Sequence, residues 1–166
     1  DGSVLSFEEN IKMSKEVVKR ASLYNAHVEA ELGYVAKLGQ SHSQKTFTHP
    51  GEAKTFVEQT GVDALAVAIG TAHGFYKEEP NLQFEILSEI QRQVKATLVL
   101  HGSSGVPAWQ LKEAISRGIC KINLATEIKN IFMKTLQETL RNTEEIDLRK
   151  MFPVATAKVT ELVKGK

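Results

Sequence analysis

The sequence predicts an α/β fold in which short parallel strands alternate with helices. Three observations lead to this class. Four short, largely apolar segments have the length of strands, and segments with helical periodicity separate them at intervals of about 30 residues. A polar stretch follows each apolar segment. In a parallel sheet these stretches lie at one edge, which is where α/β proteins bind ligands.

The beginning of the chain predicts a helix followed by a strand. Ser6 and Glu9 have the spacing of a capping box, so we expect a helix over 6–24. Residues 27–32 alternate in type, which indicates a short strand with its two glutamates on one face. Residues 34–48 show no hydrophobic period and predict a loop.

The middle of the chain predicts two further helix–strand pairs. A helical pattern over 53–59 leads to a continuous apolar run at 64–69, which is typical of a strand buried on both faces. A second helical pattern over 81–94 leads to a short apolar strand at 97–100. The repeated order predicts βαβ units and a parallel sheet.

The last third of the chain predicts one more strand between helices. We expect a helix over 107–117, a fourth strand over 121–124, a long helix over 126–142 and a final helix over 153–164. The whole chain, 1–166, is predicted to form a single, partial domain.

Composition narrows the function classes. The 21 basic residues nearly cancel the 20 acidic ones without clustering, which argues against nucleic acid and membrane surfaces as partners. Cys120 is the single cysteine, which excludes an internal disulfide and argues against a thiolate zinc site, and we expect it in the core. With no signal pattern and no long apolar run, the sequence predicts a cytoplasmic protein. The start at Asp1-Gly2-Ser3 predicts a fragment of a longer protein.

Two histidines stand directly after predicted strands. His73 and His101 would meet at one rim of a parallel sheet, where neutral imidazoles suit Zn²⁺. Glu31 and Asp1 could add carboxylate oxygens to a metal or pair with a lysine. From the residues alone two interpretations stay open: zinc ligation, and histidines that serve as ordinary hydrogen-bonding groups at strand ends.

Two strand ends have the composition of anion sites. Residues 102–105 and 123–126 place uncovered backbone N–H groups before a helix, a pattern that suits phosphate. The alternative is ordinary turn chemistry with a helix N-cap. The serine pair in 102–105 does not match a nucleophile elbow, which argues against a serine hydrolase. His42 and His49 are expected at the surface.

Five ordered segments carry a resemblance that covers nearly all of the chain. They are Asp1-Gly2-Ser3, 28–33 (VEAELG), 61–76 (GVDALAVAIGTAHGFY), 98–106 (LVLHGSSGV) and 121–127 (KINLATE). Together they resemble class II, zinc-dependent ketose-bisphosphate aldolases, closest to the tagatose-bisphosphate and fructose-bisphosphate aldolase branch.

The resemblance implies a fold, a reaction and a site. The fold is the C-terminal half of a (β/α)8 TIM barrel, and the reaction is the reversible cleavage of a ketose 1,6-bisphosphate into dihydroxyacetone phosphate and glyceraldehyde 3-phosphate. The cofactor is Zn²⁺, which stabilises an enediolate, with an additional monovalent cation as a further candidate.

The metal residues implied are His73 and His101 as ligands, and Glu31 and Asp1 at a neighbouring or alternative position. The residues implied for the phosphate and the enediolate are Gly74, Gly102, Ser103, Ser104, Asn123, Leu124, Ala125 and Thr126. The partner implied is a sugar phosphate. Because a half-barrel leaves two strand edges open, we also expect association of copies of the chain into a homo-oligomer.

Three departures from the family pattern bear on activity. The family's third zinc histidine and its proton-transferring aspartate precede the segment that this chain matches, so the catalytic acid is not assigned here. The segment 34–46 has no carboxylate where the family has acidic residues, and His-Gly-Ser-Ser replaces the more common His-Gly-Gly-Ser or His-Gly-Ala-Ser. Two other hypotheses therefore stand beside the aldolase: a truncated, non-catalytic half-barrel that binds sugar phosphates or partners, and another phosphate-binding barrel enzyme such as an isomerase.

Overall fold

Four parallel strands form the centre of the first of two compact units, Asp1–Asn123 and Leu124–Lys166. The computed structural model describes residues 1–33, 35 and 47–166. The strands pair in chain order, which confirms the predicted α/β class with parallel strands. They are β1 (Glu29–Leu32), β2 (Ala64–Val67), β3 (Thr97–Leu100) and β4 (Ile119–Ile122). Most of the predicted loop at 34–48, with His42, lies outside the described residues. The single domain over 1–166 stays a prediction.

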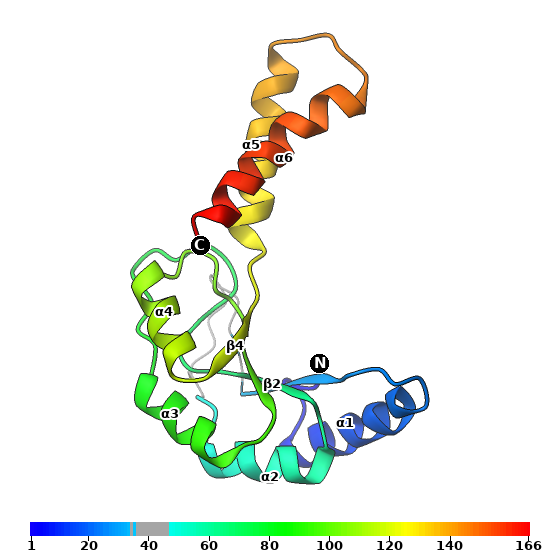
Figure 1. Cartoon of the computed structure of the whole chain (residues 1–166), viewed down its shortest axis with the longest axis vertical. Helices are drawn as coiled ribbons and strands as arrows, with labels where there is room; N and C mark the ends of the chain where they lie inside the picture. Colours follow the sequence, from blue (N-terminus) through cyan, green and yellow to red (C-terminus); the bar gives the residue numbers. More distant parts are fainter. Residues whose placement is uncertain (34, 36–46) are drawn as a thin grey trace. The chain divides into compact units, whose positions relative to one another are not determined.

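Four helices of the first unit follow one another along the outer side of these strands (Figure 1). α1 packs against α2, α2 against α3 and α3 against α4. The order of the helices therefore repeats the order of the strands, as expected for successive βαβ units. The helices are α1 (Phe7–Ser22), α2 (Pro50–Thr60), α3 (Phe84–Gln93) and α4 (Ala108–Ser116).

Helix α1 begins as its sequence predicts and fixes the first strand. The Ser6 side chain accepts a hydrogen bond from the Glu9 N–H, while the Glu9 carboxylate accepts one from the Ser6 N–H. The buried Asn10 side chain donates through Nδ2 to the backbone oxygen of Glu31, over 2.9 Å. Helix α1 therefore holds the backbone that carries a predicted metal residue.

The core of the first unit lies between the sheet and these helices. Leu65, Ala66 and Val67 of β2 are all fully buried, which confirms the strand buried on both faces. The largest fully buried helical side chains are Phe56, Leu87 and Ile90. The helices thus pack against the outer side of the sheet and do not cover the carboxyl ends of its strands.

Several element boundaries differ from the predictions. β4 covers Ile119–Ile122 instead of 121–124, and its register with β3 is irregular between Leu98 and Val99. Cys120, expected in the core, is exposed, because β4 stands at the end of the strand order and alternates buried Ile119 with exposed Cys120. His49 is exposed as expected, and its ring accepts a hydrogen bond from the Gly51 N–H at the start of α2.

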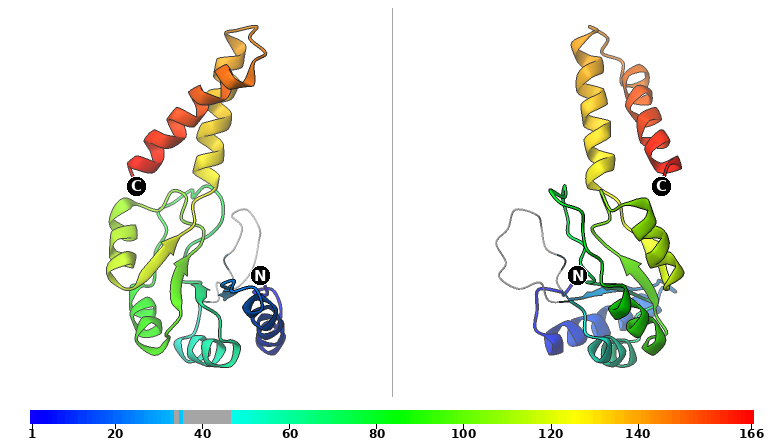
Figure 2. Two further views of the ribbon diagram at one scale, coloured as in Figure 1. Left: turned by 45° about the vertical axis from the view of Figure 1, so that its right-hand side comes forward. Right: turned by 90° about the vertical axis from the view of Figure 1, so that its left-hand side faces the viewer.

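The second unit is a pair of helices that lie side by side in both views of Figure 2. They are α5 (Thr126–Arg141) and α6 (Leu148–Lys164), and the rings of Phe132 and Phe152 meet edge to face at 5.8 Å. α6 begins earlier than the predicted residue 153, because Asp147 caps it and Pro153 lies within its first two turns. No helix in the described ranges is both long enough and apolar enough to cross a membrane.

Candidate functional site

The candidate site of the first unit gathers at the carboxyl ends of its strands. Glu31 lies near the carboxyl end of β1 and Glu29 begins that strand, while His73 follows β2 and His101 follows β3 directly. Because the strands are parallel, these ends share one edge of the sheet. The structure therefore brings together three of the four predicted metal residues, His73, His101 and Glu31.

His101 lies between two carboxylates. Its Nδ1 is 2.8 Å from Glu31 Oε2, and its Nε2 is 2.9 Å from Glu29 Oε1. The Glu31 side chain is almost completely buried, whereas Glu29 is partly exposed and also accepts a hydrogen bond from Lys121 Nζ at 2.6 Å. Both ring nitrogens of His101 are therefore occupied by acidic partners.

The charges of this cluster reinforce one another. The hydrogen bond to Glu31 is the main cause of a raised His101 pKa, and Glu29 adds to it against the effect of burial. Burial by itself raises the pKa of Glu31, but the hydrogen bond from His101, with smaller contributions, brings its net pKa below the ordinary value. The cluster thus favours a protonated His101 beside two ionised glutamates when no metal is bound.

His73 lies beside His101, and Asp1 joins the cluster through a serine. The two imidazole rings have their centroids 6.2 Å apart, and the ring of His73 is exposed. The Asp1 carboxylate accepts hydrogen bonds from the N–H and the hydroxyl of Ser3, and Ser3 lies near enough to Glu31 to make a small contribution to its lowered pKa. Asp1 is therefore linked to Glu31 indirectly, and its predicted metal role stays a prediction.

A tyrosine joins the loops after β2 and β3. The Ala72 N–H donates to Tyr76 Oη over 2.6 Å, and the same hydroxyl donates to the Gly102 carbonyl over 2.8 Å. Gly102 has φ +65°, and a Cβ there would lie 2.7 Å from the Ala72 carbonyl group, so only glycine fits this approach. The loop that carries His73 is thereby held against the loop that carries His101.

The predicted phosphate residues fall into both units. Gly74 has φ +123°, and Ser103 and Ser104 are buried, with the Ser103 hydroxyl donating to the Leu100 carbonyl at 3.3 Å. Asn123 joins the Ser103 loop to the end of β3, because its carbonyl accepts from the Ser103 N–H and its N–H donates to Leu100. The second unit contains Leu124, Ala125, which caps α5, and Thr126, which begins α5. Phosphate binding by this set stays a prediction.

The donor chemistry of the site suits zinc, but the metal group is incomplete. Imidazole nitrogens and a carboxylate are ordinary zinc ligands, and His73, His101 and Glu31 supply them at one rim. Within the ranges that the structure describes, no three His, Cys, Asp or Glu side chains form a group that could hold a metal ion as they stand. These residues therefore fit a zinc site as two imidazole donors with a carboxylate beside them, and a further donor is needed.

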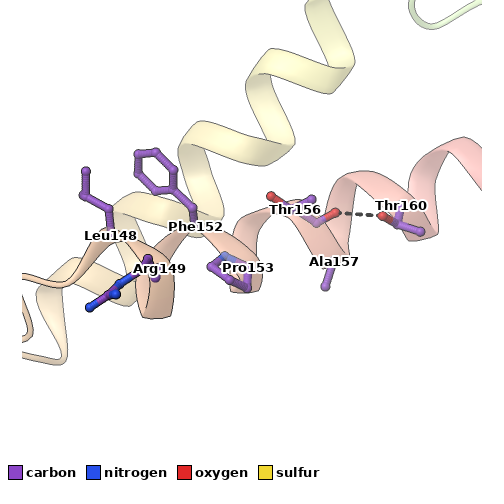
Figure 3. Close-up of a pocket in the computed structure, with 7 residues that line it drawn as sticks. All are labelled: Leu148, Arg149, Phe152, Pro153, Thr156, Ala157 and Thr160. Atoms are coloured by element: carbon purple, nitrogen blue, oxygen red, sulfur yellow. Dashed lines mark hydrogen bonds between the residues drawn. The ribbon is translucent and has the colours of Figure 1, made fainter.

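A shallow surface hollow in the second unit contributes none of this chemistry. Figure 3 shows that all its lining side chains come from α6. Its one charged side chain, Arg149, is paired with Asp147 at 2.8 Å, and none of the predicted site residues lines it. The hollow is an open stretch of helix surface between side chains.

Sequence reasoning missed Glu29, Lys121 and Tyr76 as parts of this site. Glu29 had a usable signal, because residues two apart in a strand share a face and Glu31 was already a candidate. Lys121 lies 92 residues from Glu29 in the chain, and no pattern in a single sequence predicts that contact. Tyr76 lacked a signal for the same reason, since its hydroxyl bridges two loops.

Comparison with known proteins agrees with this arrangement. The family model described as "Fructose-bisphosphate aldolase class-II" matches residues 1–166. The chain is 45% identical over 141 residues to the D-tagatose-1,6-bisphosphate aldolase subunit GatY of Klebsiella oxytoca, covering 82% of this chain and 50% of that protein. The chain thus spans about half the length of this curated relative.

Solved structures with the same fold include two named as aldolases. The YdjI aldolase from Escherichia coli K12 superimposes with a TM-score of 0.81 at 39% identity, over 97% of this chain and 55% of that one. A putative fructose-1,6-bisphosphate aldolase from Coccidioides immitis gives 0.85 at 27% identity, over 98% and 58%. The prediction of a partial (β/α)8 barrel is confirmed, since the four strands match part of larger barrels.

Proposed function

The chain belongs to the class-II fructose-bisphosphate aldolase family, and we propose that it is the part of a zinc-dependent aldolase that holds the substrate phosphate and two metal ligands. The reaction proposed is the reversible cleavage of a ketose 1,6-bisphosphate, of tagatose or fructose type, into dihydroxyacetone phosphate and glyceraldehyde 3-phosphate. The observation that carries the proposal is the meeting of His73 and His101 at adjacent strand ends in a chain of this family. The chain would act as a lyase together with the rest of its protein.

Each group of residues has a distinct part in this proposal. His73 and His101 would hold Zn²⁺, with Glu31 and Asp1 nearby as residues of a neighbouring or alternative position. When bound, zinc supplies a Lewis acid that polarises substrate oxygens. A monovalent cation beside the phosphate is a further candidate cofactor.

Backbone amides would bind the phosphate. Because Gly102 has no side chain, its backbone can lie close to the backbone of Ala72. The loop after Gly102 places small residues and backbone N–H groups at the end of the strand. The residues proposed for phosphate and triose binding are Gly74, Gly102, Ser103, Ser104, Asn123, Leu124, Ala125 and Thr126. Tyr76 keeps the two loops in contact.

The proposal is tested with the gene product that carries this chain. We expect triose phosphate release from tagatose or fructose 1,6-bisphosphate, loss of activity with a chelator, and recovery with Zn²⁺. His73→Ala and His101→Ala should each abolish chelator-sensitive cleavage, whereas His49→Ala, at an exposed helix cap, should leave it unchanged. Cleavage that persists in chelator, or no cleavage of either ketose, would exclude the zinc aldolase.

A second function is favoured by the incomplete metal group. Because the described residues contain no set of three metal donors, a non-catalytic half-barrel that binds sugar phosphates or a protein partner is the alternative. Stoichiometric zinc binding together with ketose-bisphosphate cleavage by this chain alone would rule that alternative out. Sugar-phosphate binding without zinc or turnover would favour it.

We also propose that the protein is a cytoplasmic homo-oligomer. β1 and β4 stand at the two ends of the strand order in the described part of the chain, and open strand edges favour pairing with other chains. The single, exposed Cys120 suits a reducing compartment. Light scattering of the isolated chain should show a dimer or larger species, and a stable monomer would contradict the oligomer proposal.

A further inference from the structure

Glu29 and Lys121 form a chain of contacts that ends on His101. Lys121 Nζ lies 2.6 Å from Glu29 Oε2, and the other carboxylate oxygen of Glu29 lies 2.9 Å from His101 Nε2. The two residues belong to β4 and β1, which are separated by β2 and β3 and thus by three strand spacings of about 4.8 Å each. Their direct contact shows that the sheet curves enough for inner-face side chains of its first and last strands to meet.

The two sides of the His101 ring differ in what they offer a cation. On the Nδ1 side, the Glu31 carboxylate is almost completely buried, and the ring of His73 lies nearby, with its centroid 6.2 Å from that of His101. On the Nε2 side, the Glu29 carboxylate already pairs with the ammonium group of Lys121, whose positive charge repels a second cation. The Nδ1 side is therefore the better position for a divalent metal.

A metal-binding imidazole usually donates its other ring N–H to a carboxylate, which fixes both the tautomer and the orientation of the ring. Glu29 is placed to accept that N–H from His101 Nε2. Lys121 holds Glu29 in place from the opposite side. The three residues thus have the arrangement of a histidine ligand with an outer carboxylate partner.

We propose that Glu29 and Lys121 are positioning residues that keep His101 with its proton on Nε2 and its Nδ1 lone pair toward the metal. This inference rests on the proposed zinc site. Glu29 and Lys121 act only through His101, and they lie outside the set of residues proposed to bind metal or substrate.

The solvent exposure of Lys121 and Glu29 distinguishes a role in positioning His101 from a role in stabilising the fold. The side chains of Lys121 and Glu29 are 51% and 27% exposed, so their ion pair is screened by solvent and contributes little to folding. Loss of the pair should therefore weaken zinc binding much more than it lowers thermal stability. A merely structural ion pair would not produce that difference.

The test measures zinc affinity in the gene product that carries this chain, by competition with a chromophoric chelator. Glu29→Gln and Lys121→Met should each lower the affinity about 10- to 100-fold, the range found when outer-shell partners are removed. Lys121→Arg, which keeps the positive charge, should retain most of the affinity. The matched control is Lys150→Met, which breaks an exposed lysine–glutamate pair with Glu145 in the second unit and should leave zinc affinity unchanged.

A spectroscopic measurement identifies the nitrogen that binds the metal. In the zinc-bound protein with ¹⁵N-labelled histidine, NMR should show His101 with zinc on Nδ1 and a slowly exchanging proton on Nε2. In Glu29→Gln that proton should exchange faster with water, because its carboxylate acceptor is gone.

The outcomes separate this inference from the proposed function. Zinc bound through Nε2 of His101 would refute the inference while leaving the zinc site intact. Wild-type affinity in both Glu29→Gln and Lys121→Met would do the same. A wild-type protein that binds no zinc would refute both the inference and the proposed function.

Discussion

Replacing Tyr76 with phenylalanine should loosen the contact between the two histidine-bearing loops. The substitution keeps the ring and removes only the hydroxyl, which accepts from the Ala72 N–H at 2.6 Å and donates to the Gly102 carbonyl at 2.8 Å. Burial raises the pKa of Tyr76, so its hydroxyl stays protonated and able to donate.

The cost of that substitution follows from the two hydrogen bonds. Each contributes about 0.5–1.5 kcal/mol net, and the Ala72 N–H, in a residue only 9% exposed, is left without its acceptor. We expect the free energy of unfolding to fall by about 2–3 kcal/mol. For a chain of this size that corresponds to a Tm lower by about 4–12 °C.

Thermal and urea unfolding measure this effect against a matched control. Tyr24 is 81% exposed, so Tyr24→Phe should change stability by less than about 0.5 kcal/mol. We also expect weaker binding of dihydroxyacetone phosphate by Tyr76→Phe, because the displaced loops carry the proposed phosphate residues. If Tyr76→Phe unfolds at the same temperature as Tyr24→Phe, the bridging role assigned to this hydroxyl is wrong.

Three further predictions concern the same edge of the sheet. The pKa of His101 is raised above 6.5, chiefly by Glu31, so their pairing stabilises the metal-free fold below that pH and is lost as pH rises through the raised pKa. Glu31→Gln should therefore flatten the decline in unfolding free energy as pH rises above 6.5, measured in chelator, and an equal slope in both proteins would contradict this. The Thr71 hydroxyl is buried with no hydrogen-bond partner in the described ranges, so Thr71→Val should leave the urea midpoint unchanged or raise it; a lower midpoint would reveal a partner beyond those ranges. Gly102→Ala should destabilise the protein by more than about 1 kcal/mol, because φ is +65° and the new Cβ meets the Ala72 carbonyl group; an unchanged midpoint would disprove that crowding.

The parts of the fold that depend on local chemistry could be predicted from the sequence. The capping box at Ser6 and the buried apolar run at 64–69 each need only neighbouring residues to be recognised; the box is found as predicted, and the strand covers Ala64–Val67 of that run. The boundaries of β4 were harder, because Leu124 continues the apolar pattern although pairing with β3 ends at Ile122. Hydrogen bonds to a neighbouring strand decide where a strand ends, and periodicity alone does not record them.

In the candidate site too, features that depend on neighbouring residues could be predicted, and those that depend on contacts between strands could not. His73 and His101 were recognisable because each follows an apolar run, and parallel pairing then brings their rings together. The two carboxylates that occupy both nitrogens of His101 were not foreseen as a set, since that arrangement depends on sheet curvature and side-chain rotamers. The contact of Lys121 with Glu29 depends on every strand between them.

The strand order has a consequence for how the first unit folds. Because β1 to β4 pair in chain order, each strand finds its partner one helix away, and folding can advance along the chain as in repeat proteins. The Glu29–Lys121 contact closes a segment of 92 residues and can form only after all four strands are in register. The small stability that this exposed pair contributes should therefore be lost as slightly faster unfolding with a nearly unchanged folding rate, so the contacts proposed to position His101 would be the last part of the unit to assemble.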